Sequence, residues 1–177
     1  MAGENEWKTR KERIDPKLDA AGWARPKGKS KPAAFRTEEE ETDNGPADYA
    51  LWAEGQLVGV VEAKKVTVGP QNVLTQAERY SKGVRGSAFH FPGGFKAPFL
   101  YSTNGEVFWF HDVRHPLNRS RKVAGFHTPA ALKELLGHDF DAACDKVLAL
   151  PHDNARLRPY QREANEAVEK AISDRKR

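Results

Sequence analysis

Short apolar runs bounded by turn residues dominate the middle of the chain. Residues 57–64 are apolar and mostly β-branched until their charged end, which predicts a buried strand. Residues 48–52 predict its antiparallel partner, because the intervening turn 54–56 contains Gly55, which can take a positive φ. Residues 33–39 predict the strand that precedes this hairpin. The pattern therefore predicts three consecutive strands with tight connections.

Helical periodicity flanks these strands. Residues 5–15 carry an apolar stripe, and Pro16 is expected to kink or restart this helix. Good helix formers occupy 71–82, with Pro70 in the first turn and Gly83 as the expected C-terminal cap. Further helices are predicted at 129–136, with Thr128 as N-cap, at 142–150 and at 159–172.

A second pair of strands follows the 71–82 helix. Residues 99–102 predict a buried strand, Asn104-Gly105 a two-residue turn and 106–110 the returning strand. The first strand after the helix can return parallel to the earlier ones through a right-handed crossover. The order α-β-β-β-α-β predicts an α/β fold in which helices flank a mixed central β-sheet.

Two carboxylates and an ammonium group fall where the first hairpin brings its open ends together. Asp48 begins one strand and Glu62 and Lys64 end the other, so Asp48 is expected opposite one of these two. Alternation along the strand predicts one common face for these two charges and for Val58 and Val60. Carboxylate oxygens suit Mg²⁺, and a nearby cation suits the water and phosphate of phosphodiester hydrolysis.

A second polar pair lies on the following helix. Gln76 and Tyr80 are four residues apart, so they share one helix face. Both can hydrogen-bond to phosphate, water or a carboxylate. Taken alone, the end of the strand also fits an ordinary surface salt bridge between Glu62 and Lys64.

The whole series, Asp48…Glu62-Ala63-Lys64…Gln76-x-x-x-Tyr80, resembles the nuclease core of the PD-(D/E)xK superfamily. Its last part is similar to the subgroup attached to DNA helicases and translocases.

Both ends of the chain extend this resemblance. Segments 5–10 and 14–18, followed by Gly22-Trp23, are similar to the opening of type I restriction enzyme R subunits. Residues 157–164, with Gln161, resemble the adenine-sensing Gln motif that opens a superfamily 2 helicase motor.

The resemblance implies a restriction-endonuclease-like core and hydrolysis of DNA phosphodiester bonds with Mg²⁺, or alternatively Mn²⁺. The implied site residues are Asp48, Glu62 and the Ala63 carbonyl as metal ligands, Asp48, Glu62 and Lys64 for catalysis, Gln76 and Tyr80 for positioning DNA, and Glu6 as a further acid from the first helix.

It also implies a division of the chain. Residues 1–150 are expected to form the nuclease domain, and 151–177 a linker and the start of a helicase motor that this chain lacks. ATP is then expected only at that motor, whose translocation would deliver foreign DNA. The implied partners are double-stranded DNA and the methyltransferase and specificity subunits of a restriction complex.

Composition excludes several classes of protein. A net charge of +4 over 177 residues is compatible with DNA binding. Cys144 is the sole cysteine, so no internal disulfide can form, which fits the cytoplasm. The sequence has neither a signal-peptide pattern nor an apolar run of the roughly 20 residues that span a membrane.

Other interpretations stay open at this point. The chain could be a non-catalytic DNA-binding or assembly module, or the nuclease of another helicase-nuclease, such as a type III-like restriction or repair protein. His111 and His115 have the spacing of a zinc-protease helix, but they follow a predicted strand, which argues against zinc.

Overall fold

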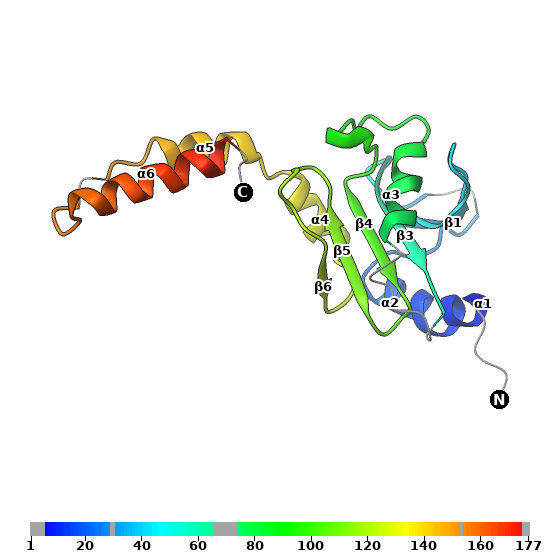
Figure 1. Ribbon diagram of the computed structural model, residues 1–177. Coiled ribbons are helices and arrows are strands. Elements are labelled where there is room, and N and C mark those ends of the chain that lie inside the picture. The colour runs from blue at the N-terminus through cyan, green and yellow to red at the C-terminus, as the bar shows by residue number, and fades with distance from the viewer. Residues whose placement is uncertain (1–5, 29–30, 66–73, 153, 175–177) are drawn as a thin grey trace. The chain divides into compact units, whose positions relative to one another are not determined.

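The computed structural model describes residues 6–28, 31–65, 74–152 and 154–174. The chain forms two compact units, Met1–Leu136 and Gly137–Arg177, and each is described by itself. The first unit is a six-stranded sheet with helices on both faces (Figure 1). This architecture confirms the predicted α/β class with a mixed sheet.

The strands lie in chain order across the sheet. They are β1 (Ala34–Glu40), β2 (Ala47–Ala53), β3 (Gln56–Ala63), β4 (Phe99–Thr103), β5 (Phe108–Asp112) and β6 (Arg121–Val123). Neighbouring strands are antiparallel except β3 and β4, which are parallel, as predicted for the return after the helix. Strand β6 was not predicted, because its short basic sequence has no apolar alternation.

The two hairpins differ in how well their turns were predicted. Gly55 takes the expected positive φ of 79°, and Glu54 joins it at 51°, as a type I′ turn requires. The expected two-residue turn at Asn104-Gly105 is wrong. Asn104 Oδ1 accepts the N–H groups of Glu106 and Val107 at 3.0 and 2.9 Å, so a four-residue loop precedes β5.

The N-terminal helical segment consists of α1 (Glu6–Thr9), a π-helical turn η1 (Arg10–Ile14) and α2 (Asp15–Ala20). Pro16 has no N–H to donate to an earlier carbonyl, and the wider π-turn directly precedes it. Helices α2 and α4 (Pro129–Leu136) cover one face of the sheet, and α3 (Leu74–Gly83) covers the other (Figure 1).

The end of α3 shows why a glycine occupies position 83. The predicted start of this helix at Pro70 lies outside the described residues. Gly83 was expected as a C-terminal cap, yet it is the last residue of the helix. A Cβ at this position would lie 2.8 Å from the backbone nitrogen of Asn44, so the close approach of the β1–β2 connection requires glycine.

The predicted common face for Val58 and Val60 is wrong because of a β-bulge. The β2–β3 pairing shifts between Leu51 and Trp52, which makes Val58 an extra residue on β3. Val58 therefore packs in the core beneath α2 and α4, whereas Val60 packs against α3. Glu62, two residues after Val60, projects on the α3 side.

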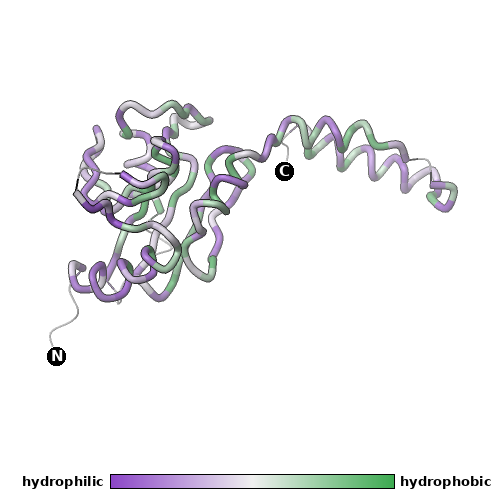
Figure 2. Tube along the Cα trace, turned by 180° about the vertical axis from the view of Figure 1, so that it is seen from behind, coloured by the Kyte–Doolittle hydropathy of each residue, from purple (hydrophilic) through white to green (hydrophobic). Residues whose placement is uncertain are grey.

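The second unit is a pair of helices, α5 (Phe140–Leu148) and α6 (Pro159–Ser173). Neither helix contains a buried residue, and Figure 2 shows hydrophobic and hydrophilic positions alternating along them. The unit begins at Gly137, earlier than the boundary expected after residue 150, and its assignment to a helicase motor stays a prediction. No helix among the described residues combines the length and apolar character that crossing a bilayer requires.

Candidate active site

The structure brings Asp48, Glu62 and Lys64 together at the adjoining ends of β2 and β3. Tyr49 lies opposite Val61, so the residues just beyond them, Asp48 and Glu62, are neighbours across the pair. Asp48 Oδ2 accepts the backbone N–H of Ala63 at 2.7 Å. Lys64 Nζ donates to Glu62 Oε1 at 2.7 Å. The strand ends therefore hold two carboxylates and an ammonium group in one cluster.

Burial makes this cluster electrostatically unusual. Glu62 is 3% exposed, and burial together with repulsion from Asp48 raises the pKa of its carboxyl group to about 7. Lys64 offsets only part of this effect. Burial also raises the pKa of Asp48, although the Ala63 N–H and the Arg10 guanidinium oppose the shift. A further cation beside these two groups would favour their ionised forms.

Arg10 is a component of the site that motif spacing did not select. Its guanidinium donates to Asp48 Oδ1 at 3.3 Å and to the Asp48 main-chain carbonyl at 3.2 Å. It also donates to Glu39 and lies 4.9 Å from the ring centre of Tyr49. The available signal was its place in segment 5–10, which resembles the opening of R subunits.

These contacts define an acidic cluster with more negative than positive groups. Its members are Glu6, Glu39, Asp48 and Glu62 with the two cations Arg10 and Lys64. Glu6 joins the cluster through Lys64 Nζ, 3.9 Å away, so the first helix does reach the strand ends. When all four carboxylates are ionised, they share two cations, so the cluster has a net charge of −2; Glu6 and Glu39 are also in contact with solvent. A divalent cation has the charge that this cluster lacks.

The donor set fits Mg²⁺ better than a softer metal. Within the described ranges, no three or more His, Cys, Asp or Glu side chains are grouped to hold one metal ion. Mg²⁺ needs few protein ligands because it retains water, and it prefers carboxylate and carbonyl oxygens. The expected set of Asp48, Glu62 and the Ala63 carbonyl is of this kind, and it stays a prediction.

Gln76 and Tyr80 lie on α3, over the face to which Glu62 projects. Tyr80 is 8% exposed and packs in the core, where its hydroxyl lies 3.5 Å from Arg79 Nη2. In the described part of the chain, neither residue hydrogen-bonds to Asp48, Glu62 or Lys64. Their expected role toward DNA stays a prediction.

Gln161 lies in the second unit, near the start of α6. Its Oε1 accepts the backbone N–H of Arg158 at 3.0 Å, so the side chain caps this helix. Its expected adenine-sensing role stays a prediction.

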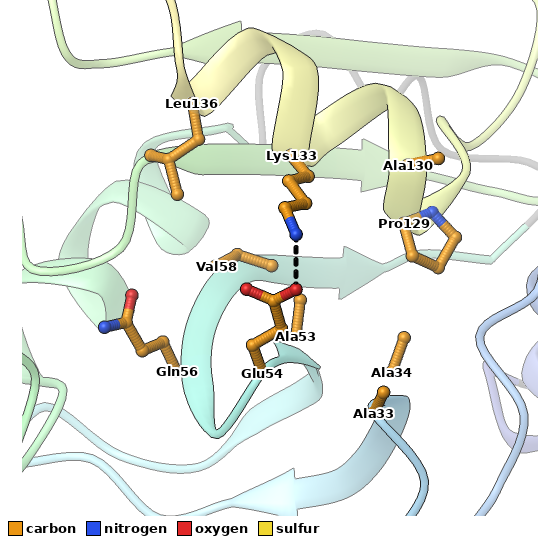
Figure 3. A pocket seen from close by; sticks show the side chains of 10 residues that line it. All are labelled: Ala33, Ala34, Ala53, Glu54, Gln56, Val58, Pro129, Ala130, Lys133 and Leu136. Carbon is orange, nitrogen blue, oxygen red and sulfur yellow. Dashed lines mark hydrogen bonds and ion pairs between the residues drawn. The ribbon is translucent and has the colours of Figure 1, made fainter.

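A cavity of about 240 Å³ lies elsewhere in the first unit, between the β2–β3 turn and α4 (Figure 3). Small and apolar side chains form most of its wall. Its charged lining residues, Glu54 and Lys133, pair with each other at 2.5 Å. The cavity offers no second group for acid–base or metal chemistry, so the acidic cluster is the candidate site.

Comparisons with known proteins agree on one family. Residues 17–136 match the family model described as the second domain of the type I restriction enzyme EcoKI endonuclease subunit. The chain is 31% identical over 212 aligned positions to the type I restriction enzyme EcoKI endonuclease subunit of Escherichia coli (strain K12). This alignment covers 90% of the chain but only 18% of that curated relative.

A solved structure supports the fold. It is a fragment assigned to an HsdR subunit of a type I restriction enzyme from Vibrio vulnificus YJ016, and it is similar to this chain with a TM-score of 0.58. The likeness covers 97% of this chain and 33% of that one, at 22% sequence identity.

Proposed function

The chain belongs to the family of type I restriction enzyme endonuclease subunits, and we propose that it carries the Mg²⁺-dependent centre that hydrolyses DNA phosphodiester bonds. One observation carries the proposal: the buried Glu62 and the partly buried Asp48, on adjacent strands, converge beside an ammonium group within a cluster whose net charge is −2 when its carboxylates are ionised. The family match favours a type I subunit over other helicase-nucleases.

Asp48 and Glu62 would hold the metal, with the Ala63 carbonyl as the expected third protein ligand. The strand pairing supports this assignment, because the Ala63 N–H already orients the Asp48 carboxylate. A bound Mg²⁺ would activate a water molecule and neutralise charge on the phosphate. Mn²⁺ prefers the same oxygen ligands and would serve the same site.

Lys64 would act on the substrate itself. Its ammonium group contacts Glu62 at 2.7 Å and its side chain is 17% exposed, so it can also reach a phosphate placed beside the carboxylates. Burial opposes its charge, but the hydrogen bond with Glu62 and the nearby carboxylates raise the pKa of Lys64, which keeps it protonated. A fixed ammonium stabilises charge that develops on the phosphate oxygens. Gln76 and Tyr80 would position the DNA strand from α3.

The rest of the subunit would supply motion and targeting. The chain spans 18% of its curated relative, and ATP-driven translocation would belong to segments outside that share. The Gln161 segment is proposed as the start of that motor. Methyltransferase and specificity subunits are the proposed partners, and site recognition would reside with them rather than here.

Lys64→Ala and Asp48→Asn separate the proposed roles. Lys64→Ala should retain Mn²⁺ and DNA binding, while its cleavage rate falls by about 10²–10³, since one charge-stabilising group is lost. Asp48→Asn should lose Mn²⁺ affinity by at least about tenfold, because a ligand is removed. Electron paramagnetic resonance of Mn²⁺ measures the affinity, and nicking of supercoiled plasmid measures the rate.

Unchanged cleavage by Lys64→Ala would remove this residue from the mechanism. If the parent protein binds DNA in EDTA and cuts with neither Mg²⁺ nor Mn²⁺, the chain is a non-catalytic DNA-binding module instead.

A further inference from the structure

A buried serine of β4 lies beside the acidic cluster. Ser102 is 0% exposed, and within the described ranges its hydroxyl oxygen has no hydrogen-bond partner. Strand β4 lies inside the sheet, where an alanine or valine would fill the position without leaving a polar atom unpaired. Because an unpaired buried hydroxyl destabilises the folded chain, this serine indicates a function other than packing.

Strand register places Ser102 directly beside Glu62. The two residues are Cα partners in the parallel pairing of β3 with β4, and adjacent strands lie roughly 4.8 Å apart (Figure 1). Glu62 projects on the α3 side. Ser102 does so as well, because it comes two residues after Leu100, which packs in the core with α3. The hydroxyl and the carboxylate therefore project from neighbouring strands on the same side of the sheet.

The neighbouring residues on this face of the sheet favour Glu62 as the acceptor. On its other side Ser102 pairs with Trp109 of β5, whose indole N–H can donate a hydrogen bond but not accept one. Leu100, the preceding residue of β4 on this face, is apolar. Lys64 Nζ donates to Glu62 Oε1, which leaves Oε2 for a second donor. Each carboxylate oxygen has two lone pairs, so Oε2 can accept the hydroxyl and still bind a metal ion.

We propose that Ser102 is a positioning residue of the site: its hydroxyl donates to Glu62 Oε2 when that carboxylate turns to bind the metal ion. The inference rests on the proposed nuclease function, because it requires Glu62 to be a metal ligand. The serine can aim its hydroxyl by rotation about one bond, and the hydroxyl hydrogen rotates to suit its acceptor. Hydrogen bonds of this kind orient metal ligands, and their loss typically lowers metal affinity or activity by about 10–100-fold.

A second buried serine provides the matched control. Ser81 on α3 is also 0% exposed, but its hydroxyl donates to the Ala97 carbonyl and accepts the Ala97 N–H, both at 3.0 Å. It therefore ties α3 to the segment before β4, a structural role that needs no metal ion. Ser81→Ala should lower the midpoint of urea unfolding in EDTA, because the backbone groups of Ala97 lose this partner.

Ser102→Ala should show the reverse pattern. In EDTA its urea midpoint should equal or exceed that of the parent protein, because an unpaired buried hydroxyl is removed and no hydrogen bond is lost. Its Mn²⁺ dissociation constant, measured by electron paramagnetic resonance, should rise about 10–100-fold, whereas that of Ser81→Ala should stay unchanged. Ser102→Thr retains the hydroxyl and should bind Mn²⁺ with an affinity close to that of the parent protein.

Plasmid nicking at increasing Mn²⁺ concentration separates positioning from a direct role in the reaction. Ser102→Ala should need more Mn²⁺ to reach half of its maximal rate, and saturating Mn²⁺ should restore most of the parental rate. A rate that stays low at saturation would place the hydroxyl in the reaction itself and contradict the positioning role.

Unchanged Mn²⁺ affinity in Ser102→Ala, or an equal loss of affinity in Ser81→Ala, would overturn the inference. If Asp48→Asn loses Mn²⁺ affinity while Ser102→Ala does not, the proposed function survives and this inference alone fails. Absence of Mn²⁺ binding by the parent protein would overturn both.

Discussion

Two charged networks adjoin each other in the first unit, and they differ in balance. The acidic cluster has four carboxylates and two cations. The neighbouring Asp15 network pairs three carboxylates with three cations; its members are Asp15, Asp19, Glu38, Lys11, Arg25 and Arg36. The two networks meet where Arg10 lies 4.0 Å from Glu38. The charges of the Asp15 network balance, whereas those of the acidic cluster do not.

The pKa of a glutamate in each network shows the effect of this difference. Burial alone would raise the pKa of Glu38, but Lys11 and Arg25 outweigh it and hold the value below its usual range. Burial and Asp48 raise the pKa of Glu62 to about 7, because Lys64 compensates only in part. A buried ion network with equal numbers of positive and negative groups is typical of one that supports the fold. Unbalanced burial on the same sheet is the feature that supports the proposed cation site.

The largest expected effect comes from breaking the balanced network. Arg36 is 2% exposed and contacts Asp19, Asp15 and the Trp23 carbonyl. Arg36→Met removes the guanidinium donor of the Trp23 carbonyl and one of the cations beside the buried Asp15, so the free energy of unfolding should fall by about 3–5 kcal/mol. Urea denaturation measures the loss. Added Mg²⁺ should recover none of it, and any substantial recovery would contradict the separation of the two networks.

Arg10→Met tests the acidic cluster in the same way. In EDTA the variant should lose about 2–4 kcal/mol, because Asp48 and Glu39 lose a buried cation. Here Mg²⁺ should recover part of the loss, since a divalent ion supplies the charge that has been removed. Arg10→Lys, which retains the charge, is the control and should lose less. A metal response no larger than that of Arg36→Met would argue against a cation site.

Glu62→Gln should stabilise the protein in EDTA at pH 8. The raised pKa means that folded Glu62 retains a proton that the unfolded chain releases. Stability from this proton is complete below the ordinary pKa of 4.5 and is lost as the pH rises through about 7. Glutamine imitates the protonated group at every pH, so the gain should be on the order of 2 kcal/mol at pH 8 and should vanish near pH 4.

Glu38→Gln is the matched control, and it should show the opposite sign. The lowered pKa of Glu38 means that its stabilisation is present at neutral pH and is lost in acid. The variant should therefore be less stable than the parent protein at pH 8 and similar to it in strong acid. Parallel pH profiles for the two glutamine variants would remove the contrast between the networks.

Tyr80→Phe should have the smallest effect on stability. The ring stays in the core, and among the described residues the hydroxyl makes only a long contact with Arg79, so the free energy of unfolding should change by less than about 0.5 kcal/mol. If the hydroxyl positions DNA, cleavage should nevertheless fall about tenfold. A loss of stability with normal cleavage would assign Tyr80 to packing alone.

The local sequence pattern was sufficient to predict which residues form the centre of the candidate site. Asp48 and Ala63 are 15 residues apart, and the short turn at Glu54-Gly55 brings them together without help from the rest of the chain. Apolar runs likewise predicted five of the strands and the parallel return to β4, because alternation and turn residues act over a few positions.

Tertiary packing decided what lies around that centre. Arg10 reaches Asp48 across 38 residues, and no periodicity links them. The bulge at Val58 depends on pairing with β2, and it changes which core each valine enters. The sequence by itself determined that two carboxylates and a lysine would meet. Only the folded chain buried Glu62 and partly buried Asp48 beside too few cations, and this charge imbalance is the reason for proposing a metal ion there.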